Sequence, residues 1–185
     1  MNTRKTLLIA LFTGLIIVGT FIKVPLPPVP ISLQTFFVIL AALIGGLQIG
    51  MFSIVIYLLL GIIGLPVFTS GGGIAALIGP TGGFLIGMLF AVVVAGIFSD
   101  RVRAEENRKK HIIFCLIGGI LATIVIYAIG VPWLKSSLDM SWTQALAAGM
   151  YPFLIGDIIK LIVALIITYN FKERFDLLLK KEIDE

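Results

Sequence analysis

The chain is poor in charge. Only 13% of its 185 residues are Asp, Glu, Lys or Arg, whereas about a quarter of a soluble domain is charged. Hydrophobic residues make up 59% of the chain, and the mean hydropathy is +1.13. A surface this apolar excludes a water-soluble globule. The composition predicts an integral membrane protein in which residues 1–185 form one domain, with no room for a second.

Residues that carry chemistry are scarce as well. The single Cys115 excludes an intrachain disulfide. The single His111 has no His, Cys or Glu partner at ligand spacing, so no metal site is expected. No set of nucleophile, base and orienting group is found, which argues against an enzyme, and no cofactor is expected. The charged stretch DRVRAEENRKKH mixes both signs, so nucleic-acid binding is not predicted.

Long apolar runs, in contrast, are abundant. A membrane-spanning helix needs about 20 residues, and six runs fit, some of them short. The pattern predicts an all-α membrane protein, a compact bundle of six transmembrane helices. The second and third runs are separated only by GGLQ, which we interpret as a tight turn because about 30 residues are too many for one crossing. The six spans are predicted at about residues 5–21, 32–45, 47–63, 82–99, 111–129 and 152–170.

Basic residues divide unevenly between the two sides of such a bundle. Lys23 and Lys135 fall on one side, Lys160 lies within a span, and the other eleven of the 14 fall on the opposite side. Cytoplasmic loops carry an excess of Lys and Arg, so both termini are predicted to be cytoplasmic in a multi-pass protein of the cell membrane. The eleven are Arg4, Lys5, Arg101, Arg103, Arg108, Lys109, Lys110, Lys172, Arg174, Lys180 and Lys181.

Two segments on the predicted outer side are rich in Gly and Pro. The first, KVPLPPVPIS at 23–32, is expected to be extended, with Ser32 placed to cap the next helix. The second, GLPVFTSGGGIAALIGPTGGF at 64–84, is either a flexible surface turn or a loop that lines or covers a substrate cavity. Its IAALI stretch could re-enter the bundle or plug it, and Thr81 could cap the following helix.

The predicted outer segment 130–149 holds both tryptophans of the chain, Trp133 and Trp142. Tryptophan is enriched at the membrane–water interface, so we expect these two side chains to lie there.

Two charges interrupt the last apolar run. Asp157 and Lys160 lie in PFLIGDIIKLIVALI, and a charge at the centre of a membrane helix costs about 2.5–3.5 kcal/mol on insertion scales. Their i, i+3 spacing places them on one helix face. One interpretation is an ion pair that only neutralises itself. The other is that the pair completes its hydrogen bonding with a polar ligand, because intramembrane ionisable residues are functional-site candidates.

Three stretches resemble one known family. PLPPVPISLQTFFVILAALIGG, GLPVFTSGGGIAALIGPTGGFLIG and GMYPFLIGDIIKLIVAL are similar to the BioY-type biotin transporters. These are the substrate-binding S components of energy-coupling-factor (ECF) vitamin transporters. The resemblance implies a six-helix S-component fold and high-affinity capture of biotin on the extracellular side.

The resemblance also implies site residues. Asp157 and Lys160 match the family's biotin-contacting GD..K motif. Family members can carry an Arg within the span at 82–99, and this chain has none there, which leaves the group that contacts the biotin carboxylate open. The further residues implied are Gln34 and Thr35 of ISLQTF, Thr81, Gly82, Gly83 and Phe84 of GPTGGF, and the apolar wall candidates Phe36, Phe68, Phe84 and Tyr151.

Energy for transport has to come from partners. The chain has no Walker motif, and the resemblance implies a membrane coupling subunit and two cytoplasmic ATPase subunits. In S components a small-residue face of the first helix docks on the coupling subunit, so we assign this role to Ala10 and Gly14; packing inside the bundle is the alternative. A different function, a solitary ion-coupled carrier of a small carboxylated solute with Asp157 as the ion site, also remains open.

Overall fold

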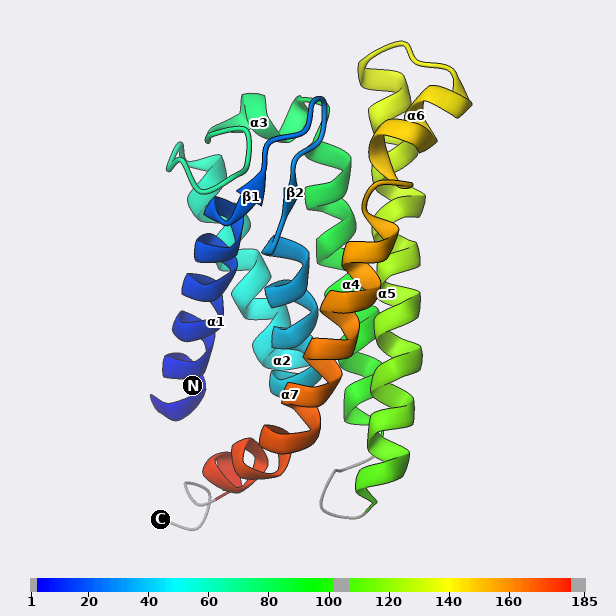
Figure 1. Ribbon diagram of the computed structural model, residues 1–185. Coiled ribbons are helices and arrows are strands. Elements are labelled where there is room, and N and C mark those ends of the chain that lie inside the picture. Colours follow the sequence, from blue (N-terminus) through cyan, green and yellow to red (C-terminus); the bar gives the residue numbers. More distant parts are fainter. Residues whose placement is uncertain (1–2, 102–106, 181–185) are drawn as a thin grey trace.

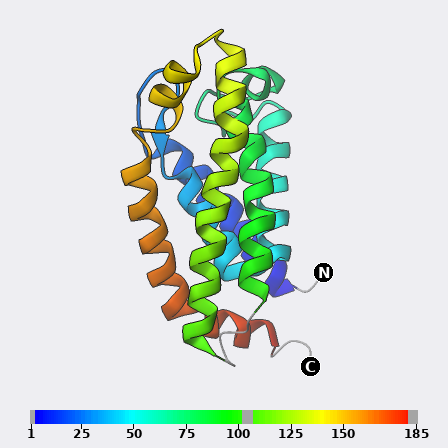
Figure 2. The ribbon, with the colours of Figure 1, turned by 90° about the vertical axis from the view of Figure 1, so that its right-hand side faces the viewer.

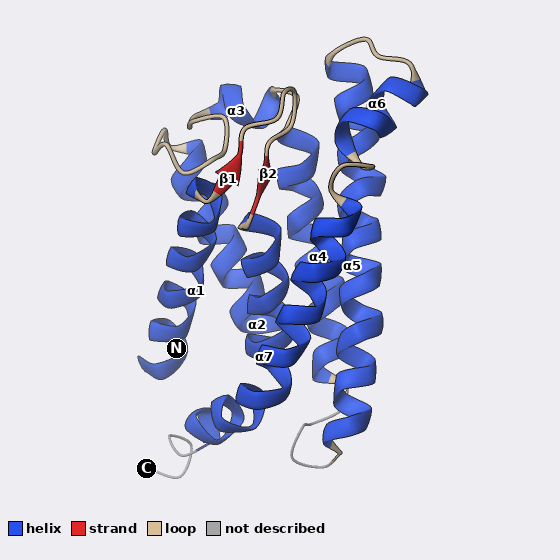
Figure 3. Cartoon of the chain, in the orientation of Figure 1, coloured by secondary structure: helices blue, strands red, loops and turns tan. Residues whose placement is uncertain are grey.

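In a computed structural model of the chain, which describes residues 3–101 and 107–180, nearly all of the backbone is helical (Figure 3). One two-stranded antiparallel ribbon, in which Lys23 pairs with Ser32, lies at one end of the bundle. The elements in chain order are α1 (Thr3–Phe21), β1 (Lys23–Val24), β2 (Ile31–Ser32), α2 (Gln34–Ile62), α3 (Ile74–Ile78), α4 (Gly82–Asp100), α5 (Arg108–Ser137), α6 (Trp142–Gly149) and α7 (Leu154–Lys180).

Helix α2 is a hairpin of two helical arms that reverses at Gly46. This glycine has φ 71° and ψ −173°, a conformation that favours glycine because it has no Cβ. A Cβ at Gly50 would lie 3.0 Å from the Cα of Ala42, so the arms run back along each other. Asp100 Oδ2 accepts from the first backbone N–H of the second arm, that of Leu47, at 2.9 Å. The tight turn predicted between the second and third runs is therefore confirmed.

Helix α4 packs between α2 and α5, and glycines allow the close approach (Figure 2). A Cβ at Gly96 would lie 2.5 Å from the Cα of Leu47, and one at Gly87 would lie 3.0 Å from the Cα of Ile126. The backbones of three helices thus meet along α4, where small fully buried residues such as Ala91 and Ala95 complete the core.

Helices α5 and α7 are longer than the sequence predicted. The predicted span at 111–129 lies within α5, which continues through Pro132 to Ser137. Trp133, which we had placed in an outer segment, lies within α5. Its ring packs against Gly83, and its Nε1 donates to the carbonyl of Gly79 at 3.0 Å.

The end of the bundle with the ribbon also holds α3 and α6 (Figure 1). Helix α6 was not predicted; a capping box between Ser141 and Gln144 starts it. The IAALI stretch forms α3, whose Ile74 and Ile78 are 59% and 66% exposed, so it does not plug the bundle. Thr81 precedes α4 but makes no capping hydrogen bond.

The helix ends at Thr3, Asp100, Arg108 and Lys180 lie together at the opposite end (Figure 1). Polar contacts tie them: Lys5 Nζ donates to Gln48 Oε1 at 2.9 Å, and the buried Lys172 Nζ donates to the carbonyl of Ile44 at 2.9 Å. The basic residues Arg103 and Lys181, which we assigned to this side, lie outside the described residues.

Five described helices are long and apolar enough to cross a membrane. They are α1, α2, α4, α5 and α7 up to Asp176, and α2 with its two arms is one of the five. The coarse prediction of an all-helical membrane protein therefore holds.

Candidate functional site

A cavity lies between α2, α4, α5 and α7, beneath the ribbon. Its walls are mostly apolar, and its polar groups come from the three helices α2, α5 and α7, from strand β2 and from two loops. The open space in it is about 60 Å³, small against the roughly 300–1,000 Å³ of a typical small-molecule site. The lining residues are Val29, Pro30, Ser32, Gln34, Thr35, Phe36, Ile39, Thr69, Thr81, Phe84, Leu85, Met88, Thr123, Ile126, Tyr127, Phe153, Asp157, Lys160, Leu161 and Ala164.

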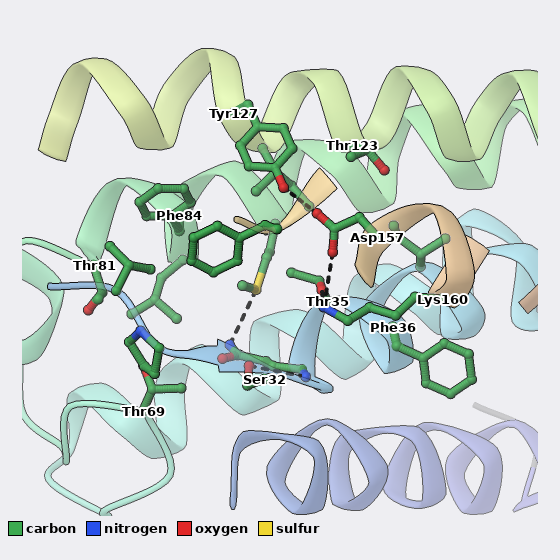
Figure 4. A pocket seen from close by; sticks show the side chains of 18 of the residues that line it. Ser32, Thr35, Phe36, Thr69, Thr81, Phe84, Thr123, Tyr127, Asp157 and Lys160 are labelled. Atoms are coloured by element: carbon green, nitrogen blue, oxygen red, sulfur yellow. Dashed lines mark hydrogen bonds and ion pairs between the residues drawn. The ribbon is translucent and has the colours of Figure 1, made fainter. Parts of the chain in front are cut away.

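Asp157 is the centre of a polar network on one wall of this cavity (Figure 4). Lys160 Nζ lies 2.9 Å from Asp157 Oδ1, and the Tyr127 hydroxyl donates to Asp157 Oδ2. Lys160 Nζ also donates to Thr35 Oγ1 at 3.1 Å. The side chains of Lys160 and Asp157 are only 12% and 14% exposed, so the pair is largely shielded from its surroundings.

Local structure explains where these groups sit. Asp157 lies in the first turn of α7, where the positive end of the helix dipole favours a carboxylate. Lys160 follows one turn later on the same face, and Thr35 is the second residue of α2. Both helix starts lie below the ribbon, which brings residues 125 positions apart within hydrogen-bond distance.

The arrangement suits binding and not bond-making chemistry. The opposite charges of Asp157 and Lys160 cancel, so the network offers a neutral ligand one strong acceptor and one strong donor. Apolar side chains such as Ile126 and Phe84 surround it, as is usual for small-molecule sites. Among the described residues, no group of three His, Cys, Asp or Glu side chains could hold a metal ion.

Six of the ten predicted ligand-binding residues meet at this cavity, as does the further wall candidate Phe36. The six are Gln34, Thr35, Thr81, Phe84, Asp157 and Lys160.

The other four predicted residues lie outside the cavity lining. Phe68 is buried but stacks edge-on against Tyr57, with ring centroids 5.4 Å apart. Tyr151 is 54% exposed on the surface between α6 and α7. Gly82 and Gly83 pack against the Trp133 side chain. All four residues lie in or near the family motifs in the sequence, but this proximity does not determine whether a residue faces the cavity.

Sequence reasoning missed Tyr127, the hydroxyl partner of Asp157, and Thr123 on the same wall. These two residues are four apart in an otherwise apolar helix, a spacing that places polar groups on one face. This spacing is the sequence feature from which the two residues could have been predicted. Met88 and Phe153 also line the cavity, but nothing distinguishes them from other apolar residues of the spans.

A second, wider groove of about 500 Å³ lies against α5, α6 and α7. Thr123, Tyr127, Asp157 and Leu161 line both spaces. The hydrogen bond between Tyr127 and Asp157 therefore forms part of the wall between the polar cavity and this groove, whose other lining residues are nearly all apolar.

The small residues of α1 lie away from the cavity. Ala10 is exposed, and a Cβ built at Gly14 meets no atom within 4 Å. Leu7, Leu11 and Val18 on the same helix are also more than half exposed. In the described part of the chain, the bundle leaves this face uncovered, which disfavours internal packing as the role of the two small residues.

Comparison with known proteins gives a consistent result. The sequence profile described as "BioY family" matches residues 1–176. A probable biotin transporter BioY of Lysinibacillus sphaericus is 43% identical over 155 residues, which cover 84% of this chain and 76% of the relative. The biotin transporter BioY of Thermotoga maritima is 37% identical over 171 residues, which cover 92% and 96% of the two chains.

A solved structure shares the fold. The crystal structure of the S-component for biotin from an ECF-type ABC transporter superposes with a TM-score of 0.80 at 29% identity, and 92% of each chain is covered. With a family profile that spans nearly the whole sequence and relatives well above 30% identity, the chain belongs to the BioY family.

Proposed function

We propose that this protein binds biotin and mediates its uptake across the membrane as the substrate-specific S component of an ECF-type transporter. The observation that carries the proposal is the shielded Asp157–Lys160–Tyr127 network in a cavity of the bundle. Charged side chains inside a membrane protein cost free energy and mark functional sites. The relatives of this chain are named as biotin transporters or as an S-component for biotin. The protein is a transport protein and not an enzyme.

The chemistry of biotin fits the groups at the cavity. Its ureido ring has two N–H donors and one carbonyl acceptor, and its fused rings and aliphatic chain are apolar. Asp157 accepts from a ureido N–H, and Lys160 with Thr35 donates to an oxygen of the ligand. Phe84 and Phe36 supply apolar walls at either side of these groups.

Binding requires the site to open. The open space of about 60 Å³ is well below the roughly 300–1,000 Å³ of a typical small-molecule site, so a bicyclic ligand with a five-carbon acid chain does not fit into it. The walls above the cavity are loop segments, including Val29, Pro30 and Thr69, and Lys23 Nζ ties the ribbon to the carbonyl of Thr69 at 2.7 Å. Movement of these loops away from α7 is the simplest way to admit the ligand.

The topology we propose has six crossings, with both termini in the cytoplasm. The reversal of α2 at Gly46 supports two crossings by its arms, of which the first, at residues 34–45, is short. The grouping of the helix ends at Thr3, Asp100, Arg108 and Lys180 supports a common cytoplasmic side. The ribbon end, with the cavity beneath it, then faces the exterior, from which biotin enters.

The partners we propose are a membrane coupling subunit and two ATPase subunits. The uncovered face around Ala10 and Gly14 supports α1 as the docking helix for the coupling subunit, because small residues allow helices to approach closely. Leu7 and Leu11 beside them supply apolar contact area.

The proposal is tested by equilibrium binding of radiolabelled biotin to the purified chain in detergent. We expect saturable binding that unlabelled biotin displaces and that unrelated carboxylates do not. No binding by a well-folded preparation contradicts the proposal. Uptake into ATP-depleted vesicles that an uncoupler abolishes would favour the solitary ion-coupled carrier.

A further inference from the structure

Gln34 is a buried amide at the edge of the cavity. It opens the first arm of α2, is 2% exposed and lines the cavity. Its side-chain Nε2 donates to the Tyr57 hydroxyl oxygen at 2.9 Å and to Met88 Sδ at 3.2 Å. Both protons of the amide nitrogen are therefore directed at protein acceptors.

Tyr57, on the second arm of α2, determines this orientation. It is fully buried and does not line the cavity. Its hydroxyl donates to the backbone carbonyl of Val67 at 3.0 Å, and in the described part of the chain no other donor reaches that carbonyl. A buried carbonyl without a donor is costly. The other acceptor within reach, Thr20 Oγ1, is farther away at 3.3 Å and itself donates to the carbonyl of Ile16. The single hydroxyl proton of Tyr57 therefore stays on the bond to Val67. Toward Gln34 the hydroxyl oxygen can then only accept, and only the NH₂ end of the amide fits against it.

The carbonyl end of the same amide consequently faces the other way. No described residue donates to Gln34 Oε1. Among the described residues, Thr168 Oγ1 is the one side-chain oxygen or nitrogen that is fully buried and has no hydrogen-bond partner. Gln34 Oε1 has no partner either, so it is not fully buried and has access to open space. Gln34 Oε1 therefore borders the cavity that its residue lines.

We infer that Tyr57 is a positioning residue for ligand recognition: it fixes the Gln34 amide so that Oε1 accepts a hydrogen bond from a ureido N–H of biotin. The inference rests on the proposed function. It gives the site two acceptors, Gln34 Oε1 and Asp157, for the two N–H donors of the ureido ring, while Lys160 and Thr35 remain donors for ligand oxygens. A ligand without the second N–H leaves Oε1 unpaired and is disfavoured.

A double-mutant cycle on the purified full chain tests this, with biotin affinity and melting temperature measured for each variant. Tyr57→Phe should weaken biotin binding about 2- to 10-fold, the value of one neutral hydrogen bond. Gln34→Met should weaken it at least as much, and the double variant should be no weaker than Gln34→Met alone. Thr13→Val is the control. It removes a buried hydroxyl that donates to the Ser53 carbonyl at 3.3 Å, away from the cavity, and should lower stability while leaving affinity unchanged.

Two biotin analogues, each methylated on one ureido nitrogen, supply a second measurement, the first part of which needs only the unmodified chain. The unmodified chain should bind both more weakly than biotin, and one of the two should lose no further affinity in Tyr57→Phe. Additive losses in the cycle, or analogues that bind as tightly as biotin, overturn the inference while the proposed function stands. An unmodified chain that does not bind biotin contradicts the proposed function and the inference together.

Discussion

At the scale of single residues, the ion pair between Asp157 and Lys160 uses only part of the hydrogen-bonding capacity of the two side chains. The two side chains neutralise each other at 2.9 Å, and Tyr127 and Thr35 take up further hydrogen-bonding capacity. A carboxylate has about four acceptor sites and an ammonium three donors, so capacity remains that faces the cavity. Burying that capacity unused costs free energy, whereas a ligand with complementary groups recovers it.

The double replacement Asp157→Asn with Lys160→Met separates folding from recognition. Either single replacement leaves a shielded charge without its partner, at a cost of about 3–5 kcal/mol in stability. The double variant removes both charges and should regain much of that stability. It should still bind biotin about two to four orders of magnitude more weakly, because two charge-assisted hydrogen bonds of about 1.5–3 kcal/mol each are lost.

Biotin titration and the melting temperature of the purified double variant check this expectation. A folded double variant with the affinity of the parent would mean that the pair serves only to neutralise itself.

At the scale of elements, the hairpin of α2 holds the cavity together. Its first arm carries Gln34 and Thr35, and its second arm carries Tyr57. The reversal at Gly46 sets the two arms in register, since Gln34 and Tyr57 are 23 residues apart and yet form a hydrogen bond. A change at the turn should therefore alter the position of Gln34 relative to Tyr57 at the opposite end of the two arms.

Replacing Gly46 by Ala should destabilise the protein. The conformation at φ 71° and ψ −173° is essentially restricted to glycine and costs an alanine about 1–3 kcal/mol. The new Cβ would also lie 2.3 Å from Asp100 Oδ1, which disturbs the side chain that caps the second arm. Gly14→Ala is the matched control, because its Cβ meets no atom within 4 Å in a helix, where alanine is favoured over glycine by about 0.5–1 kcal/mol.

Thermal unfolding in one detergent compares the two variants. We expect a lower melting temperature for Gly46→Ala and an unchanged or slightly higher one for Gly14→Ala. Equal melting temperatures would show that the turn is not a constraint on the fold.

At the scale of the whole molecule, the bundle has two different ends. The ribbon, α3 and α6 lie at the cavity end, and the start of α1 at Thr3 and the end of α7 at Lys180 lie at the other (Figure 1). The exposed face of α1 runs between these ends. We propose that ligand capture takes place at the cavity end and that the exposed face of α1 serves assembly with partners.

The orientation in the membrane is open to a labelling experiment. Lys109 and Ser137 are exposed and mark the two ends of α5. In a background with the buried Cys115 replaced by Ala, Ser137→Cys should react with a membrane-impermeant maleimide in intact cells. Lys109→Cys should react only after the cells are permeabilised. Reaction of Lys109→Cys from outside would reverse the topology and place the cavity on the cytoplasmic side.

A substitution on the exposed face of α1 should prevent assembly with the coupling subunit without weakening ligand binding. Ala10→Trp with Gly14→Trp places two large rings on a face that the bundle leaves open, so the isolated chain should still bind biotin. Uptake in cells that also produce the coupling subunit and both ATPases should be lost, because the rings prevent close helix contact. If biotin binding falls in parallel with uptake, the two residues support the bundle and do not dock a partner.

The sequence alone determined the class of protein and several local features. Its apolar runs predicted the membrane helices because the bilayer requires a minimum length of apolar backbone. GGLQ predicted the reversal of α2, and two charges in an apolar helix identified Asp157 and Lys160, since both signals stand out against a uniform background. The resemblance of three stretches added Gln34, Thr35, Thr81 and Phe84, which do line the cavity; whether each contacts the ligand remains a prediction.

Only the tertiary structure decided which apolar and aromatic residues face the cavity. In a membrane helix the sides that face lipid and the sides that face other helices are both apolar, so hydrophobic periodicity does not separate them. Tyr127, 30 residues from Asp157, became its partner through the packing of α5 against α7, while Tyr151 near Asp157 in sequence turned to the surface. The link from Val67 through Tyr57 to Gln34 likewise exists only because the hairpin brings its arms together, since hydrogen-bond direction depends on which atoms meet in space.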